Sequence, residues 1–150
     1  MLTPGSLAPD FSAPTDSGSL TLSALRGQKV VLYFYPKDNT PGCTVEAQGF
    51  RDVSAELAAA GAVVLGVSKD TVRSHQSFKQ KQCLPFTLVS DPGGICEAYG
   101  VWRKKKLYGR EYDGIARVTF LVGADGRLLS VWDPVKVKGH AAEVLAAVRG

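Results

Sequence analysis

The sequence predicts an α/β fold in which helices flank both faces of a mixed central β-sheet. Buried strands alternate with helical segments along the middle of the chain, which indicates a parallel portion of the sheet. Residues 123–126, Gly-Ala-Asp-Gly, separate two apolar runs and predict a β-hairpin, which adds antiparallel strands. With 150 residues, 45% of them hydrophobic, the chain can form an adequate core, and we expect a single domain over 1–150.

The N-terminal part of the chain is interrupted by prolines and glycines up to about residue 20. Only short edge strands fit there, near Phe11 and Leu20, as an N-terminal β extension of the sheet. A short helix is expected over 21–26, because Gly27 follows it. Residues 30–35 are a continuous β-branched and aromatic run, which is the pattern of a strand buried on both faces.

The middle and the C-terminal part continue the alternation. Apolar residues recur at helical spacing from Cys43 to about Ala60, and Gly61 ends that helix. This order is compatible with a thioredoxin-like fold, although other α/β sandwiches share it. The remaining predicted elements are a strand over 62–67, a helix over 71–81 capped by Asp70, a strand over 86–89, helical turns over 94–99, hairpin strands over 116–122 and 127–132, and a helix over 141–148.

The net charge of +4 comes from one short segment. Residues 102–110 hold five bases and no acid; without these five of the 18 basic residues, 13 remain against 14 acidic ones. We interpret the segment as a solvated loop or surface edge, with docking of an acidic protein partner as the alternative. Nucleic-acid binding is not expected, because it requires bases spread over a groove-sized face.

No part of the sequence has the pattern of a membrane or export segment. No stretch approaches the ~20 apolar residues of a membrane helix. The first 20 residues lack both a basic start and a continuous apolar core, so we expect no secretory signal. The sequence therefore predicts a soluble protein of the cytoplasm without a membrane partner.

The chain has three widely spaced cysteines, Cys43, Cys83 and Cys96, and no Cys-x-x-Cys pair. Only His75 and His140 could supplement them as soft ligands, so a structural zinc site is not expected. A secreted disulfide scaffold does not fit either, since the chain is large and poor in cysteine. Catalytic or redox use of a cysteine remains.

Cys43 stands at a position that favours reactivity. Thr40 precedes a proline, which biases it towards an extended conformation suited to a helix cap. Pro41 then takes the first helical position and Cys43 the third. There the sulfur lies among unpaired backbone N–H groups at the positive end of the helix dipole, which favour the thiolate over the thiol.

Residues 35–47 read Tyr-Pro-Lys-Asp-Asn-Thr-Pro-Gly-Cys-Thr-Val-Glu-Ala and contain the pattern Pro-x-x-x-Thr-x-x-Cys. This segment resembles the peroxidatic-cysteine motif of peroxiredoxins, specifically the bacterioferritin-comigratory-protein or Q-type branch. The resemblance covers nearly the whole chain. Further matching segments are Ala-Pro-Asp-Phe at 8–11, Phe-Arg-Asp at 50–52, Leu-Val-Ser-Asp-Pro at 88–92 and Tyr-Asp-Gly-Ile-Ala-Arg-Val-Thr-Phe-Leu at 112–121.

The resemblance implies a thioredoxin-like fold and a thiol-dependent peroxidase that reduces hydrogen peroxide and organic hydroperoxides in antioxidant defence. Cys43 would attack the peroxide and become a sulfenic acid. Thr40 would hold the peroxide through its hydroxyl, Pro36 would shield the sulfur from water, and Arg117 would reach across from a neighbouring strand. No metal, haem, flavin or other cofactor is implied.

Each of these residues also has a structural interpretation. Cys43 could be a small buried hydrophobe, and Thr40 only the helix cap. Pro36 could simply end a strand, and Arg117 could form an ordinary surface ion pair. We expect Glu46 either to pair with a nearby arginine or to act chemically. His75 and His140 are expected to be exposed residues of helices, without a role.

Ionisation of the thiol is a minor part of the rate that a peroxidase requires. With a pKa near 8.5, only about 3% of a free cysteine is thiolate at pH 7. A pKa of roughly 6 raises that fraction about 30-fold, but the accompanying loss of nucleophilicity takes back roughly 13-fold. The net gain is about twofold. Alignment of the O–O bond and stabilisation of the departing oxygen must supply the rest.

The step after oxidation requires a second thiol. Many members of this branch carry a resolving cysteine five residues after the peroxidatic one, where this chain has Gln48. The resemblance implies Cys83 as the resolving residue, with Cys96 or a one-cysteine enzyme as alternatives. The disulfide would be reduced by thioredoxin or a similar dithiol, which the basic 103–110 segment could help to dock. The resemblance also favours a monomer.

A Cys43–Cys83 disulfide would need a change of local structure. It requires Cα atoms about 4.4–6.8 Å apart, whereas one helix start and another helix end are expected to lie farther apart. We therefore expect the first turn around Cys43 to unwind during turnover. Two other functions remain open: a thioredoxin-type oxidoreductase, which lacks its second cysteine because Glu46 stands there, and a redox sensor that is oxidised without turnover.

Overall fold

The computed structural model describes residues 2–150, and at its centre lies a seven-stranded β-sheet with the strand order β2-β1-β5-β4-β3-β8-β9. Strands β3, β4 and β5 run parallel, whereas β8 is antiparallel to β3 and β9 to β8. The sheet is mixed, as predicted. Its strands are β1 (Ser12–Thr15), β2 (Gly18–Thr21), β3 (Lys29–Phe34), β4 (Ala62–Ser68), β5 (Thr87–Ser90), β8 (Val118–Val122) and β9 (Leu128–Trp132).

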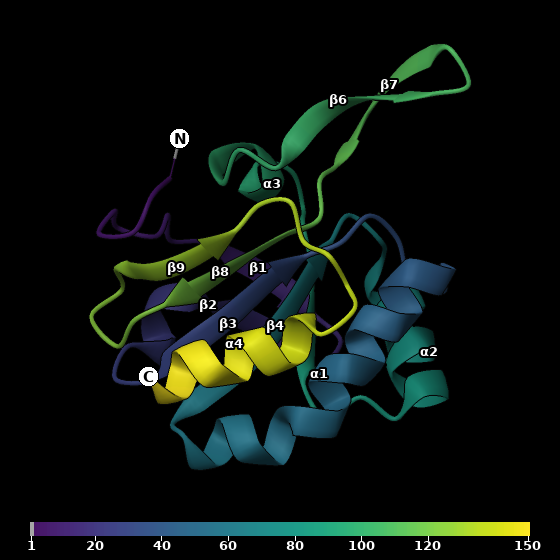
Figure 1. Ribbon diagram of the computed structural model, residues 1–150. Helices are drawn as coiled ribbons and strands as arrows, with labels where there is room; N and C mark the ends of the chain where they lie inside the picture. Colours follow the sequence, from purple (N-terminus) through teal and green to yellow (C-terminus); the bar gives the residue numbers. More distant parts are fainter. Residues whose placement is uncertain (1) are drawn as a thin grey trace.

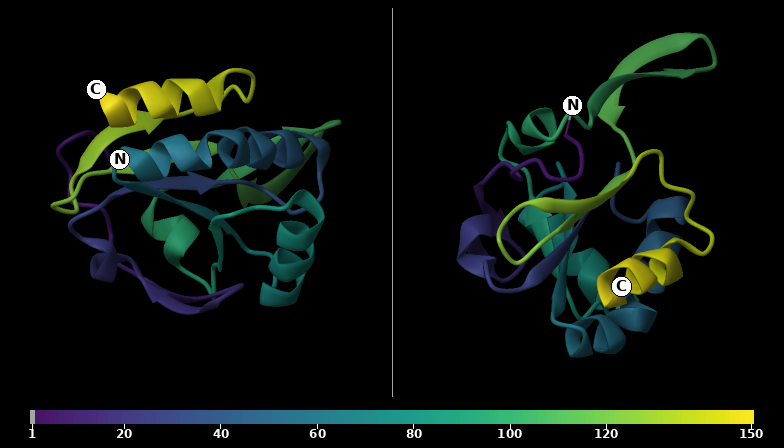
Figure 2. Two further views of the ribbon diagram at one scale, coloured as in Figure 1. Left: turned by 90° about the horizontal axis from the view of Figure 1, so that it is seen from below. Right: turned by 60° about the vertical axis from the view of Figure 1, so that its left-hand side comes forward.

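Helical segments lie on both faces of this sheet. Figure 2 shows α1 and α4 side by side on one face, where Phe50 of α1 and Val144 of α4 share a cluster of buried residues with Tyr33 of β3. On the other face, Cys96 of α3 packs in a second cluster with Phe34. The predicted α/β class is therefore confirmed. The helices are η1 (Leu22–Leu25, a 3-10 helix), α1 (Pro41–Ala59), α2 (Val72–Gln82), α3 (Ile95–Ala98) and α4 (His140–Arg149).

The sheet brings two distant segments to one edge. Strand β3 ends at Phe34, and the chain turns through residues 35–40 into α1. Because β8 runs antiparallel to β3, its first residue, Val118, pairs with Phe34. Arg117, which precedes β8, therefore lies at the edge of the sheet from which α1 begins. Strand pairing alone thus brings Arg117 near Cys43.

A second hairpin was not predicted. Strands β6 (Trp102–Leu107) and β7 (Arg110–Ile115) form a separate two-stranded sheet, which projects from the body of the molecule in Figure 1. The basic segment is thus exposed, as expected, but it is a strand. Its run of lysines lacks the apolar alternation that identifies a half-buried strand. Tyr108 and Gly109, with φ of 51° and 77°, form the turn.

The structure corrects three expectations about polar residues. His75 and His140 are buried, with 0% and 3% of their surface exposed, and are not exposed helix residues as predicted. Hydrogen bonds compensate their burial, since both rings have polar partners. The cap of α2 is Thr71, whose hydroxyl accepts from the backbone N–H of Ser74 at 3.1 Å, and not Asp70. The carboxylate of Asp70 instead accepts from the backbone N–H of Asp38.

Within residues 2–150, no helix has both the length and the apolar character needed to cross a bilayer.

Candidate functional site

Cys43 occupies the first turn of α1, as the sequence predicts. Thr40 is the residue before the helix, with an extended backbone (φ −83°, ψ 153°), and Pro41 is the first helical residue. The backbone N–H of Thr44 makes the first helical hydrogen bond, to the carbonyl of Thr40 at 2.9 Å. The N–H groups before it remain directed out of the helix end. Only 1% of the surface of Cys43 is exposed, so the sulfur lies just beneath the molecular surface.

Arg117 contacts the sulfur directly. Its Nη2 donates to Sγ of Cys43 at 3.3 Å, and its Nη1 donates to Oε1 of Glu46 at 2.7 Å. One guanidinium group therefore joins two residues of α1 that lie one helical turn apart. Although burial opposes it, the negative charges of Glu46 and Cys43 raise the pKa of Arg117. Arg117 is not an ordinary surface ion pair, because its fixed positive charge faces the thiol.

Gly42 allows this approach. A Cβ atom at this position would lie 3.2 Å from Nη2 of Arg117, closer than most Cβ contacts in proteins. No positive φ requires glycine here, since Gly42 has ordinary helical backbone. The space above its Cα is therefore the reason that glycine suits the position. This contact between Gly42 and Arg117 was not predicted from the sequence.

Glu46 is buried in contact with Arg117. Only 3% of its surface is exposed, and Oε2 has no hydrogen-bond partner among the described residues. Burial raises the pKa of Glu46 to about 7, although the charge of Arg117 and its hydrogen bond lower it. Of the two expected roles, the structure shows the ion pair with an arginine. That pair orients the guanidinium towards the sulfur.

Thr40 does not cap α1 through its side chain. Its hydroxyl donates to the carbonyl of Lys37 at 2.8 Å, within the loop that precedes the helix. Because that bond uses the hydroxyl proton, the oxygen keeps its lone pairs for another donor. Pro36 is half-buried at the start of the same loop. Thr40 and Pro36 thus belong to the loop that leads directly into the helix start that carries Cys43.

Cys83 is the residue that ends α2. It is exposed and adopts a left-handed backbone conformation, with φ 55° and ψ 47°. Its neighbour Gln82 accepts from Nε2 of Gln48 at 2.9 Å and, through its carbonyl, from Nη1 of Arg51 at 3.0 Å. Two residues of α1 therefore hold the end of the helix that carries Cys83. All three cysteines are free thiols in this structure.

Cys96 is buried, whereas Cys83 is exposed. None of the surface of Cys96 is exposed, and it belongs to the cluster of apolar residues beneath α3. Burial and the nearby carboxylate of Asp91 raise the pKa of its thiol well above the usual range.

Two residues near the site were not predicted from the sequence: Asp38 in the loop and its partner His75 in α2. Asp38 is 4% exposed, although the adjacent Lys37 and Asn39 are exposed. A charged residue between a buried strand and a reactive helix start is the signal that could have identified it. His75 gave no such signal, because a single histidine in a polar helix usually faces solvent.

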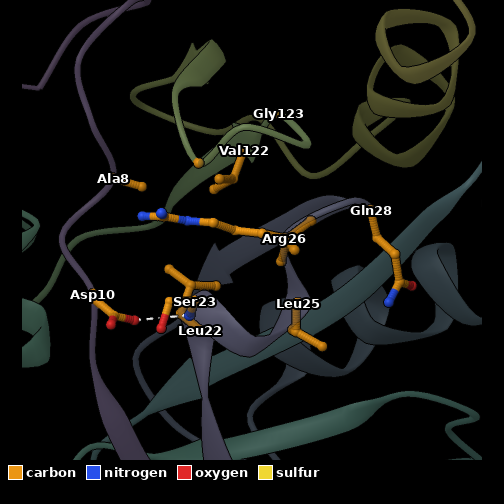
Figure 3. Close-up of a pocket in the computed structure, with 11 residues that line it drawn as sticks. Ala8, Asp10, Leu22, Ser23, Leu25, Arg26, Gln28, Val122 and Gly123 are labelled. Atoms are coloured by element: carbon orange, nitrogen blue, oxygen red, sulfur yellow. Dashed lines mark hydrogen bonds between the residues drawn. The ribbon is translucent and has the colours of Figure 1, made fainter.

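The pocket drawn in Figure 3 is separate from this site. It lies between the N-terminal segment and the end of β8, and Arg26 extends across it. Its lining residues include Gln28, just before β3, and Val30 near the start of β3, whereas Cys43 lies beyond the end of that strand. The pocket and Cys43 therefore lie at opposite ends of β3.

The raised pKa of Glu46 predicts a dependence of stability on pH. A carboxyl group whose pKa rises on folding stabilises the fold below its unfolded value of 4.5, and this contribution is lost as pH rises through 7. We expect the free energy of unfolding of the wild type, relative to Glu46→Gln, to fall by on the order of 3 kcal/mol between pH 4.5 and 8. Urea unfolding of both proteins measures this difference. A difference that grows with pH would contradict the assignment.

Comparison with known proteins places the chain in a family. Residues 4–131 match the AhpC/TSA family. The putative peroxiredoxin bcp of Coxiella burnetii is 58% identical over 143 residues, covering 94% of this chain and 95% of that protein. Peroxiredoxin Bcp of Bacillus subtilis is 48% identical over 147 residues, covering 97% and 94%.

Solved structures give the same result for the fold. Bacterioferritin comigratory protein of Xanthomonas campestris superposes with a TM-score of 0.90 at 42% identity, over 99% of this chain and 96% of that one. A Xylella fastidiosa PrxQ variant gives a TM-score of 0.93 at 40% identity, with the same coverage. Both are peroxiredoxins with the layered mixed sheet described above. The chain therefore belongs to the AhpC/TSA family, as a thioredoxin-fold peroxiredoxin similar to the Bcp and Q-type members.

Proposed function

We propose that Cys43 is the peroxidatic cysteine of this thiol-dependent peroxidase, and that it reduces hydrogen peroxide and organic hydroperoxides in antioxidant defence. The observation that carries the proposal is the hydrogen bond from Nη2 of Arg117 to Sγ of Cys43 at the start of a helix. The solved structure from Xanthomonas campestris is described in connection with alkyl peroxide reduction, which supports organic hydroperoxides as substrates.

The first chemical step is a displacement at oxygen. The Cys43 thiolate attacks one peroxide oxygen, an S–O bond forms as the O–O bond breaks, and the departing oxygen takes a proton to leave as water or alcohol. Sulfur is oxidised to a sulfenic acid while the peroxide is reduced. Arg117 stabilises the charge that develops on the departing oxygen, because its guanidinium lies beside the sulfur at which the O–O bond breaks.

Thr40 and Pro36 complete the site in this proposal. The Thr40 hydroxyl donates to Lys37, so its oxygen is an acceptor for the O–H of a bound hydroperoxide. That contact would orient the O–O bond towards the sulfur. Pro36 brings an apolar ring without an N–H to the same loop, and so limits access of water to Cys43.

The resolving step is assigned to Cys83. Its thiol attacks the Cys43 sulfenic sulfur, an S–S bond forms, and the sulfenic oxygen leaves as water. Its exposure and its place beside Gln82, which α1 contacts, support this assignment over the buried Cys96. Formation of the disulfide requires the first turn of α1 to unwind. A dithiol reductant such as thioredoxin then returns both residues to thiols and becomes a disulfide itself.

Several expectations stay predictions. They are a single domain over 1–150, a cytoplasmic location, a monomer, and docking of the reductant at the exposed β6–β7 hairpin. A one-cysteine peroxidase differs from this proposal in the role of Cys83, whereas a redox sensor is oxidised without turnover. Peroxide turnover with a recycling reductant separates the sensor from both peroxidases.

The Cys83→Ser variant tests the resolving step. We expect peroxide turnover with thioredoxin to fall at least 100-fold, whereas turnover with a small thiol persists, because small thiols can reduce the sulfenic acid directly. Mass spectrometry of the peroxide-treated wild type should show a Cys43–Cys83 linkage. Cys96→Ser is the control, and should keep both activities. Stable sulfenic or sulfinic acid at Cys43 with Cys83 still free would exclude the two-cysteine cycle.

The Gly42→Ala variant tests the approach of Arg117. The added methyl displaces the guanidinium by a few tenths of an ångström, and we expect the rate of Cys43 oxidation by hydrogen peroxide to fall roughly tenfold. Complete removal of such a donor typically costs 10²–10³-fold. Gly49→Ala is the matched control, since it also lies in α1 and its Cβ would meet only ordinary contact at 3.4 Å. Equal rates in the two variants would show that the close approach is unimportant.

A further inference from the structure

Asp38 is a buried acidic residue in the loop that carries Thr40. The loop spans 35–40, between β3 and α1, and includes Asn39 with a left-handed φ of 64°. Asparagine adopts this conformation more readily than most residues, but the loop still needs contacts that hold it. Only 4% of Asp38 is exposed, so its carboxylate points into the protein rather than towards solvent.

Four hydrogen bonds connect Asp38 to the rest of the protein. The carboxylate accepts from the hydroxyl of Tyr35 at 2.6 Å, from the hydroxyl of Ser74 at 2.8 Å and from Nδ1 of His75 at 2.7 Å. Its backbone N–H donates to Oδ2 of Asp70 at 2.8 Å. Ser74 and His75 lie in the first turn of α2, and Asp70 precedes that helix. Asp38 therefore joins the loop to α2.

The contact between Asp38 and His75 is buried and fully hydrogen-bonded. Tyr35 and Ser74 both donate to the carboxyl group of Asp38. Nε2 of His75 lies 3.1 Å from the carbonyl oxygen of Val89, which can only accept, so this nitrogen carries a proton. A hydrogen bond of 2.7 Å joins Nδ1 of His75 to Oδ2 of Asp38. The two side chains are 0% and 1% exposed.

The same groups do not need a metal ion. Potential ligand atoms of Asp38, Asp70 and His75 lie within 4.8 Å of one another. However, Oδ2 of Asp70 accepts from Asp38 and Ser68, and both ring nitrogens of His75 are already hydrogen-bonded. Hydrogen bonds within the protein thus satisfy the cluster.

The two sides of the site are held independently. Arg117, the residue before β8, donates from its side chain to Cys43 and Glu46 of α1 and makes no side-chain hydrogen bond with the loop among the described residues. Thr40 belongs to the loop, two residues after Asp38, and its hydroxyl contacts the carbonyl of Lys37 beside Asp38. A change in the loop would therefore move Thr40 while the contact of Arg117 with the thiol remains.

We propose that the buried hydrogen-bonded pair of Asp38 and His75 positions the loop of residues 35–40, and through it Thr40, for the reaction of Cys43 with peroxide. His75 is a positioning residue that acts from 35 positions beyond Thr40 in sequence, in the helix that also carries Cys83. The inference rests on the proposed peroxidase function and extends it to a residue outside the motif. Loss of His75 removes one of the contacts that hold the Asp38 carboxyl group against α2, which favours a shift of the loop.

Two rate constants of Cys43 test this role in the full chain, both followed by mass spectrometry of the Cys43 peptide. Oxidation by hydrogen peroxide requires Thr40 in place, whereas alkylation by iodoacetamide requires only an accessible thiolate. For His75→Leu we expect the peroxide rate to fall at least tenfold and the alkylation rate to change less than threefold. His75→Gln, which keeps a donor towards Asp38, should fold in any case and lose several-fold in the peroxide rate alone.

His140→Leu is the matched control. His140 is also buried, and a hydrogen bond of 2.8 Å joins its Nε2 to the hydroxyl of Thr119. Its ring makes no hydrogen bond with the loop among the described residues. We expect its removal to lower stability but to change neither rate constant more than threefold. Parallel loss of both rates in the His75 variants, or an unchanged peroxide rate, would overturn the positioning role. A wild type without peroxide turnover would instead overturn the proposed function itself.

Discussion

The rest of the site depends on the contact between the guanidinium of Arg117 and the sulfur of Cys43. The guanidinium donates to Cys43 at 3.3 Å and to Glu46 at 2.7 Å, and so places a fixed positive charge against the sulfur. The contact joins residues 74 positions apart in sequence. Only the antiparallel pairing of β8 with β3 brings them together, because it sets Val118 opposite Phe34 at the edge of the sheet where α1 begins. The mixed sheet is thus a requirement of the chemistry as well as of stability.

Two separate contacts hold the groups of the site. Glu46 orients Arg117, and in our proposal the buried pair of Asp38 and His75 holds the loop that carries Thr40. This division suits a peroxidase, because ionisation of the thiol yields only about a twofold gain after the loss of nucleophilicity is counted. Alignment of the O–O bond needs groups that are fixed in position. The second of these contacts involves α2, so the helix that ends in Cys83 also contributes to the site of the first step.

The sequence predicted the parts of this site that follow from local pattern. The extended Thr40 before Pro41 defines the start of α1, the motif at 35–47 identifies Cys43, and the family resemblance implies Arg117. It did not predict what depends on tertiary contact. His75 looks exposed because α2 is polar, yet the partners of its two ring nitrogens come from other segments. The β6–β7 hairpin was missed for a similar reason, since its lysines face solvent and show no apolar alternation.

The central claim is that Arg117 accelerates the reaction by stabilising charge on the departing oxygen rather than by ionising Cys43. The most direct measurement compares Arg117→Lys with the wild type, using the rate constants of Cys43 for hydrogen peroxide and for iodoacetamide. Lysine keeps the positive charge but lacks the planar fork that contacts Cys43 and Glu46 together. The account predicts that the peroxide rate constant falls about 100-fold or more, while the iodoacetamide rate constant changes less than threefold. Equal losses in both rate constants would contradict it.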